Sequence, residues 1–268
     1  MNMLNIGCGD IYHPDWVNVD VSGGRNVSSL DITNGLPFPD AMFDVVYHSH
    51  LLEHIRHEKT LAFMKECLRV LKPGGVIRVL VPDLEQIARL YLEKLYTARE
   101  HESDYDWIVL EMYDQCVRET TGGLMESNLR DTPSGLTPFV DSRMGASAAL
   151  YSEQAKEKPA SIKPTWQNCV RVVHLLRLKF AKLIVYAIAG DKGRDAFEEG
   201  IFRNSGEIHR WMYDRFSLGR LMENSGFSNI QVVSPFVSSI PGFDCFKLDV
   251  IDGVVRKPDS LVMEGVKL

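Results

Sequence analysis

Short apolar runs separated by turns dominate the first 83 residues. The runs at residues 3–7, 16–20, 26–31 and 43–49 have the length and β-branched content of strands. Between residues 58 and 71, apolar side chains recur every three or four positions, which predicts a helix that Lys72-Pro73-Gly74-Gly75 ends. Residues 76–83 are almost wholly apolar, as in a strand covered on both faces of a parallel sheet. This alternation predicts an α/β fold.

The pattern changes after residue 83. Amphipathic helices are predicted at residues 84–100, 105–118 and 165–189, and the Gly-, Pro-, Ser- and Thr-rich stretch 121–164 favours loops. A helix at 217–224, closed by Gly226, and strands at 229–233 and 246–252 restore the α/β pattern. We therefore predict one α/β domain formed by residues 1–83 and 209–268, interrupted by a helical insertion at 84–208.

Composition narrows the class of protein. The 268 residues are 45% hydrophobic and 25% charged, as in an ordinary soluble globular chain. A formal charge of −6 argues against unaided binding of nucleic acid, which needs a basic surface. The five cysteines show no CxxC spacing and so favour a reducing compartment, and no charged leader precedes the first strand. We expect a cytoplasmic protein.

The sharpest local signal is a glycine turn after the first strand. Gly7-Cys8-Gly9 brings bare backbone to the carboxyl edge of the sheet, where a ligand can approach closely. Asp20, at the end of the next strand, is placed to accept hydrogen bonds from two ribose hydroxyls. Residues 7–15 are too few for the usual crossover helix, and the third glycine of a dinucleotide fingerprint is missing. A mononucleoside ligand is therefore favoured over a nicotinamide dinucleotide.

Two longer motifs extend this signal. "LDITNGLPFPDAMFDVVYHSHLLEHI" precedes "ECLRVLKPGGVIRVLVPD". Together with the glycine turn, and in this order, they resemble the S-adenosylmethionine-dependent methyltransferases with a Rossmann-like fold. The nearest resemblance is to small methyltransferase-domain proteins associated with bacterial surface-glycan pathways. The resemblance implies a seven-stranded, mostly parallel sheet, a helical insertion after the fifth strand that forms an acceptor lid, and S-adenosylmethionine as the cofactor.

The resemblance also implies roles for particular residues. The expected contacts to the methionine and ribose parts of the cofactor come from Gly7, Cys8, Gly9 and Asp20. Asp31 and Ile32 would meet the adenine, and His48 and Ser49 would border the methionine amine and the methyl group.

The histidines are the candidates for acid–base chemistry. A sulfonium methyl is already activated, so the enzyme must mainly align the acceptor, but a hydroxyl acceptor gains from a general base. His48, His50 and His209 are the candidate bases, each with a structural role as the alternative. His50 and His54 lie four residues apart without a third nearby ligand, so no metal site is predicted. Glu53 is expected at the N-terminus of a helix, where the helix dipole stabilises its negative charge.

The insertion and the segment just after it offer features that a solvated surface or the core would also explain. Asp114 and Arg118 predict a surface ion pair or a polar lip over the acceptor, and Trp211 and Tyr213 predict either an aromatic platform or core. Residues 158–190 hold six Lys and Arg and no Asp or Glu, so the remainder carries −12 (−6 minus +6). The helix at 165–189 is interpreted as a solvated face, a homodimer contact or a peripheral contact with an anionic membrane. Its stripe of Val172, Val173, Leu176, Phe180, Leu183 and Ile184 is expected to face the core.

Two function classes remain open. The first is methyl transfer from S-adenosylmethionine to a small-molecule or glycan acceptor, with a hydroxyl as the expected attacking group. The second is a non-catalytic binding or scaffold protein that keeps the methyltransferase fold, which the compressed first crossover motivates.

Overall fold

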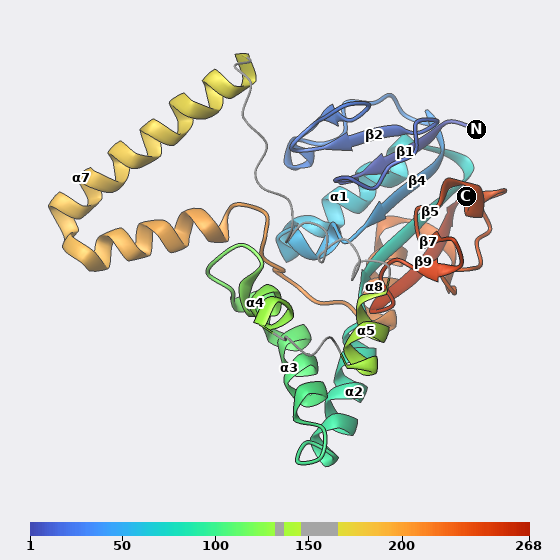
Figure 1. Ribbon diagram of the computed structural model, residues 1–268. Helices are drawn as coiled ribbons and strands as arrows, with labels where there is room; N and C mark the ends of the chain where they lie inside the picture. Colours follow the sequence, from blue (N-terminus) through green and yellow to red (C-terminus); the bar gives the residue numbers. More distant parts are fainter. Residues whose placement is uncertain (132–136, 146–165) are drawn as a thin grey trace.

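A mixed seven-stranded sheet forms the centre of the protein. The computed structural model describes residues 1–131, 137–145 and 166–268 (Figure 1). The strand order is β3-β2-β1-β4-β5-β9-β6. The strands are β1 (Met3–Ile6), β2 (Val17–Asp20), β3 (Ser28–Ser29), β4 (Phe43–Ser49), β5 (Leu71–Pro82), β6 (Phe227–Val232) and β9 (Ser260–Lys267). Strands β3, β2, β1, β4 and β5 pair in parallel, and β9 pairs antiparallel with both β5 and β6. The predicted Rossmann-like, mostly parallel sheet is confirmed.

Helices cover one face of this sheet and also form the insertion. α1 (His57–Val70) and α8 (Arg215–Ser225) pack on the face that carries Leu4, Val46 and Ile77. The insertion follows β5, as predicted, and its helices are α2 (Leu84–Tyr96), α3 (Glu102–Val117), α4 (Gly123–Asp131), α5 (Pro138–Met144) and α7 (Trp166–Arg203). In Figure 1, α2 and α3 lie side by side below the sheet, and α7 extends away from it.

A loop segment, rather than a helix, covers the opposite face. Residues 7–16 form turns, which Asn18 Nδ2 stabilises by donating to the carbonyl oxygens of His13 and Trp16, each at 2.9 Å. Trp16 then packs in a cluster with Tyr47 and Phe243. The predicted absence of a first crossover helix is thus observed, and residues of the segment between β6 and β9 occupy that face instead.

Three expectations about secondary structure are corrected. The helix expected at residues 58–71 ends at Val70, and β5 already pairs with β4 at Leu71. The Pro-Gly-Gly stretch lies within β5, in a register shift between the Phe43–Leu71 and Val45–Val76 pairs. The loop-rich stretch contains α4 and α5. The strand expected at 246–252 is divided between the 3-10 helix η3 (Phe243–Phe246) and β7 (Val250–Ile251), which pairs with β8 (Val254–Val255) outside the main sheet.

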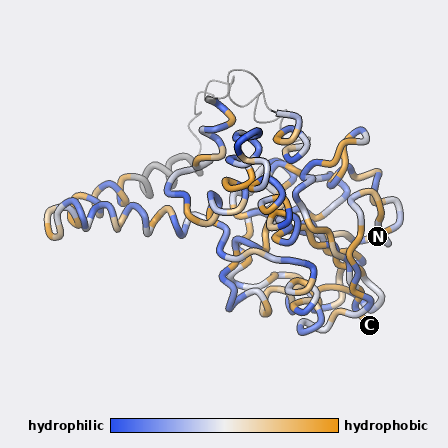
Figure 2. Tube along the Cα trace, turned by 90° about the horizontal axis from the view of Figure 1, so that it is seen from below, coloured by the Kyte–Doolittle hydropathy of each residue, from blue (hydrophilic) through white to orange (hydrophobic). Residues whose placement is uncertain are grey.

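The first half of α7 does not pack its apolar stripe on the core, which contradicts the expectation. Val172 and Val173 lie outside the residues whose side chains are described, whereas Leu176, Phe180, Leu183 and Ile184 are exposed. Figure 2 shows hydrophobic and hydrophilic positions alternating along this arm. Gly190, with φ 65°, bends the helix back on itself. Among the described helices, none is long and apolar enough to cross a membrane.

Candidate functional site

The predicted cofactor residues gather where β1, β2, β3 and β4 end. Gly7 and Gly9 both have positive φ angles, of 66° and 50°. A Cβ on Gly7 would lie 2.7 Å from the side chain of Leu51, whereas a Cβ on Gly9 would meet nothing within 4 Å. Glycine is therefore favoured at position 7 mainly by its positive φ, and Gly9 leaves open space beside the turn.

Asp20 connects this turn to the second strand. Its Oδ2 accepts a hydrogen bond from the Gly9 N–H at 3.0 Å, and its Oδ1 accepts from the N–H and hydroxyl of Ser22 at 2.9 and 2.6 Å. Burial opposes ionisation, but these hydrogen bonds outweigh it and lower the pKa of Asp20. The carboxylate is thus held ionised beside the open space at Gly9, as an acceptor for hydroxyl groups.

Asp31 and Ile32 follow the third strand. Asp31 caps the 3-10 helix η1 (Ile32–Asn34), and its Oδ1 accepts from the N–H and hydroxyl of Thr33 at 2.9 and 2.7 Å. The Thr33 hydrogen bonds lower the pKa of Asp31. The carboxylate is therefore ionised and exposed at the same end of the sheet as Asp20.

Cys8 and His48 are enclosed below this edge. Burial raises the pKa of Cys8 to about 11, so its thiol is neutral at physiological pH. Burial also lowers the pKa of His48 to about 4, and its ring meets Phe63 edge-on with centroids 5.5 Å apart. Both ring nitrogens of His48 lack a hydrogen-bond partner among the described residues. His48 is therefore a neutral ring under the end of β4, next to the partly exposed Ser49.

A second group of side chains lies just beyond β4. Glu53 lies in the first turn of the 3-10 helix η2 (Leu52–His54), as expected, and is fully buried. His50 Nδ1 and His209 Nε2 lie 3.3 and 3.9 Å from Glu53 Oε1. The rings of His54 and His209 meet with centroids 4.8 Å apart. We call Glu53, His50, His54 and His209 the histidine–glutamate cluster.

The chain returning from the insertion completes this cluster. The His209 N–H donates to the carbonyl oxygen of Gln115 in α3 at 2.9 Å, and the Arg210 N–H donates to that of Glu53 at 2.7 Å. Burial lowers the pKa of His209 to about 3, despite the nearby Glu53 carboxylate. The structure thus brings together His50 and His209, two of the predicted bases, and adds Glu53 between them. Sequence reasoning missed Glu53 because its partner at 209 is separated from it by the whole insertion.

The remaining candidate motifs, at residues 114–118 and 211–213, form ion pairs, hydrogen bonds and packing contacts within the protein. Arg118 pairs with Asp114 at 2.9 Å, but both side chains are largely buried, so this is no surface pair. Asp114 Oδ1 also accepts from the Leu124 N–H at 2.7 Å, which ties α3 to α4. Tyr213 is core, whereas Trp211 is 43% exposed and stacks on His57 with ring centroids 4.0 Å apart.

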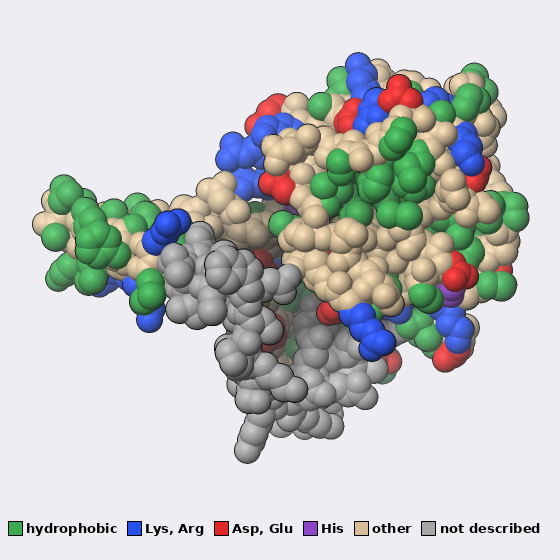
Figure 3. All heavy atoms as spheres, turned by 90° about the horizontal axis from the view of Figure 1, so that it is seen from above, with side chains coloured by type: hydrophobic (Ala, Val, Ile, Leu, Met, Phe, Trp, Pro, Cys, Tyr) green, Lys and Arg blue, Asp and Glu red, His purple; other side chains and the backbone are tan. Residues whose placement is uncertain are grey.

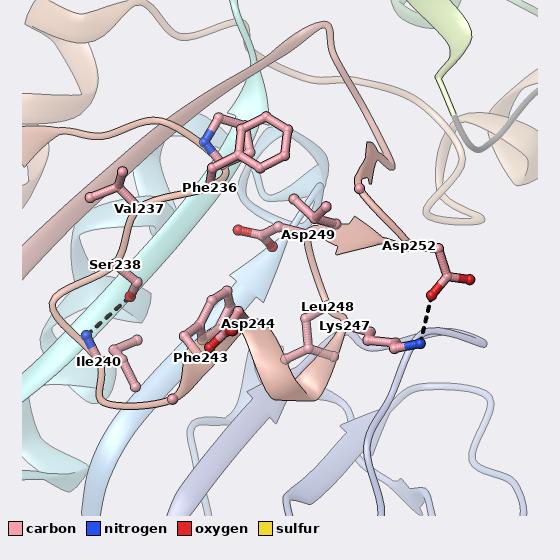
Figure 4. Close-up of a pocket in the computed structure, with 14 residues that line it drawn as sticks. Phe236, Val237, Ser238, Ile240, Phe243, Asp244, Lys247, Leu248, Asp249 and Asp252 are labelled. Atoms are coloured by element: carbon pink, nitrogen blue, oxygen red, sulfur yellow. Dashed lines mark hydrogen bonds and ion pairs between the residues drawn. The ribbon is translucent and has the colours of Figure 1, made fainter.

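A cavity of about 420 Å³ lies elsewhere, between the segment after β6 and the β7–β8 hairpin. Figure 4 shows Phe236, Phe243 and Asp249 around it, and an ion pair between Lys247 and Asp252 at its rim. The Asp249 carboxylate is already bound by Tyr47 and Arg78, each at 2.7 Å. None of the predicted site residues lines this cavity, so it is separate from the candidate site.

The chain is similar in sequence to known methyltransferases. A family model described as "Methyltransferase domain" matches residues 21–79, which span the chain from the end of β2 into β5. A protein of Mycolicibacterium smegmatis named as a probable S-adenosylmethionine-dependent methyltransferase is 35% identical over 103 residues. This match covers 31% of the present chain and 38% of the relative, so the chain matches well under half of that protein's length.

Solved methyltransferase structures are similar to the chain at low identity. One from Thermotoga maritima, described as a possible histamine N-methyltransferase, has a TM-score of 0.38 at 13% identity and covers 100% of this chain and 82% of its own. A methyltransferase from Archaeoglobus fulgidus has a TM-score of 0.39 at 13% identity, with coverage of 99% and 86%. The sequence similarity over residues 21–79 is to a methyltransferase domain, and the longer sequence match is to a probable S-adenosylmethionine-dependent methyltransferase.

Proposed function

We propose that the protein is an S-adenosylmethionine-dependent methyltransferase that methylates a hydroxyl of a small-molecule or glycan acceptor. The observation that carries the proposal is the ionised Asp20 beside the open turn at Gly9, within a sheet edge that also presents Asp31 and Ser49. The match to a methyltransferase-domain family over residues 21–79 supports it. The glycan preference depends on the resemblance of the sequence motifs.

The cofactor would supply the activated methyl group. Asp20 would accept hydrogen bonds from the ribose hydroxyls, and Asp31 with Ile32 would meet the adenine. Gly7, Cys8 and Gly9 would line the methionine and ribose, and His48 with Ser49 would close the methionine end. The buried, neutral Cys8 and His48 add no positive charge beneath the place proposed for the positively charged sulfonium.

The acceptor would be activated at the histidine–glutamate cluster. Deprotonating a hydroxyl as it attacks requires a neutral imidazole within reach, held in one orientation. Glu53 Oε1 lies 3.3 Å from His50 and 3.9 Å from His209, so the carboxylate orients both rings. Because the side chains of His48 and His209 are buried and that of His50 is 10% exposed, the proposed base is His50.

A calorimetric titration of the purified chain with S-adenosylmethionine and S-adenosylhomocysteine tests the proposal. We expect micromolar binding, weakened at least tenfold by Asp20→Asn, because hydrogen bonds to a charged group contribute about 1.5–3 kcal/mol each. Asp15→Asn is the matched control, since Asp15 is exposed in the same loop region. Equal affinity of Asp20→Asn and the parent would refute the role of Asp20. Absence of binding to the folded, ligand-free protein would instead favour the scaffold alternative.

We also propose that the first half of α7 lies on an anionic lipid surface. Leu176, Phe180, Leu183, Ile184 and Ile188 are 60%, 66%, 64%, 44% and 82% exposed. At 100° per residue they form one stripe; Lys179 lies beyond one edge of it, and Arg177 lies within it, between Ile184 and Ile188. Figure 3 shows hydrophobic side chains gathered on this arm, with basic side chains beside them. Residues 158–190 carry six basic and no acidic side chains in a chain of net charge −6, and this concentration of positive charge supports contact with an anionic lipid surface.

Vesicle sedimentation tests the lipid contact. Vesicles rich in phosphatidylglycerol should bind the protein at low salt, neutral phosphatidylcholine vesicles should not, and high salt should release it. Phe180→Ser with Leu183→Ser should weaken binding at least tenfold. Phe216→Ser, which changes an equally exposed aromatic residue on α8, should not. A lipid-free dimer that these α7 substitutions dissociate would show that the stripe contacts a second copy instead.

A further inference from the structure

The Glu53 carboxylate is buried without the partners that such a group usually has. Its exposed fraction is 0%, and neither oxygen receives a hydrogen bond of good geometry from the described residues. Among those residues, the ion pairs that reach it come from His50 and His209. A buried, ionised carboxylate is costly unless a cation or several donors compensate it. The described side chains around Glu53 therefore do not fully compensate its buried charge.

Three side chains from two distant segments converge on this point. Potential ligand atoms of Glu53, His54 and His209 all lie within 4.8 Å of one another. His54 comes from the same short helix as Glu53, and His209 comes from the segment after the insertion. Glu53 and His209 are buried and His54 is partly buried. The arrangement is therefore shielded from water, unlike a chance cluster of surface acids.

We propose that Glu53, His54 and His209 bind a divalent transition-metal ion, with zinc as the best match. Two imidazole nitrogens and one carboxylate oxygen suit zinc and similar metals, whereas magnesium and calcium prefer oxygen ligands alone. Ligands about 2.0–2.2 Å from a tetrahedral zinc lie roughly 3.3 Å apart, so the three side chains need to close by an ångström or so. Three protein ligands leave a fourth position open.

The surrounding contacts fit this role. His54 Nδ1 lies 3.2 Å from the carbonyl oxygen of Ile208, a contact that is favourable when Nδ1 carries the proton, and this leaves Nε2 free to bind a metal. His50 lies outside the triad: its Nε2 is 2.8 Å from the Ser260 hydroxyl and its Nδ1 faces Glu53 Oε1. His50 would thus orient the carboxylate, as an outer partner of a metal ligand commonly does.

Lys257 is the competing cation. Burial lowers the pKa of Lys257, whereas the charges of Asp259 and Glu53 act in the opposite direction. A metal ion bound at Glu53 would be repelled by the Lys257 ammonium group. Removal of that charge should therefore strengthen metal binding, whereas it would weaken a site in which Lys257 alone neutralises Glu53. This opposite expectation separates the two explanations.

The test uses the full-length chain without an affinity tag, stripped with a chelator and titrated with zinc alone. We expect one zinc per chain, measured by competition with a chromophoric chelator, and a visible cobalt spectrum when cobalt replaces zinc. Glu53→Gln and His209→Gln should each weaken zinc binding at least tenfold. His57→Gln is the matched control, because His57 stacks on Trp211 outside the triad. Lys257→Met should tighten binding several-fold.

Three results would overturn the proposal: no stoichiometric zinc binding by the folded parent, equal affinity of parent and Glu53→Gln, or weaker binding by Lys257→Met. Circular dichroism of each variant separates ligand loss from misfolding. Zinc binding is read without cofactor or acceptor, so its failure is distinct from failure of the methyltransferase proposal, which the S-adenosylmethionine titration reports.

Discussion

Arg78 is the residue whose replacement should most clearly reveal what holds the helix-free face of the sheet. It lies in β5, is 0% exposed, and donates from Nε to Asp249 at 2.7 Å and from Nη1 to Glu264 at 2.6 Å. Nη1 also donates to the carbonyl oxygen of Val237 at 2.9 Å, and the guanidinium stacks on Phe243 at 4.7 Å. One side chain thus joins β5 to β9 and to the segment between β6 and β9.

Arg78→Met should destabilise the protein by about 3–5 kcal/mol, the usual cost of leaving a buried charge without its partner. Two carboxylates lose their cation, although Tyr47 still binds Asp249 and the hydroxyls of Ser238 and Ser239 still donate to Glu264. Burial raises the pKa of Asp249 even beside Arg78. Without Arg78 that carboxyl can take up a proton at mildly acidic pH, so the loss of stability should be larger at pH 8 than at pH 5.

Urea unfolding followed by circular dichroism at both pH values measures this effect. Arg89→Met is the control, because Arg89 pairs with Glu85 while 73% exposed and should cost less than about 1 kcal/mol. Combining Arg78→Met with Asp249→Asn and Glu264→Gln should recover much of the loss, since no buried charge then remains. The reasoning is refuted if Arg78→Met alone lies within about 1 kcal/mol of the parent, or if its cost is independent of pH.

The parts of the fold with local causes could be predicted from sequence. Strands β1, β2 and β4 and helix α1 follow from short apolar runs and helical spacing, and the turn at Gly7 follows from its glycines. Strand β9 was not predicted, because Glu264 and Gly265 interrupt its apolar run. Glu264 is stabilised in a central strand by Arg78, which is 186 positions away in the chain, and by Ser238 and Ser239. Such a long-range charge pair leaves no local signal.

The candidate site also has one part that could be predicted from the sequence and one part that could not. The residues predicted to bind the cofactor lie at strand ends, where the topology of a parallel sheet makes their proximity predictable. The histidine–glutamate cluster depends on where the chain re-enters after the insertion, and the Arg210 N–H bond to the Glu53 carbonyl fixes that position. Likewise, periodicity correctly identified the apolar stripe of α7, but periodicity cannot tell whether a stripe meets the core or faces outward.

Two further predictions concern the elements that shape the cofactor edge. Gly7→Ala should weaken S-adenosylmethionine binding and cost at least about 1 kcal/mol in urea unfolding. The reason is that a φ of 66° strains alanine and that its Cβ would collide with the side chain of Leu51. An affinity and an unfolding free energy equal to those of the parent would exclude a packing role for Gly7. Glu66→Gln should cost about 1–2 kcal/mol at pH 7, a value reduced for the 31% exposure of the Glu66–Arg69 pair. The Arg69 hydrogen bonds, assisted by the Leu36 N–H, lower the pKa of Glu66 from 4.5 to about 2. Because the folded-state pKa is depressed, this stabilisation is complete above pH 4.5 and disappears as the pH falls towards 2. Parent and Glu66→Gln should therefore differ in unfolding free energy at pH 7 and converge near pH 2–3. A difference that persists in acid would show that Glu66 acts through packing of the loop after Asp31 rather than through its charge.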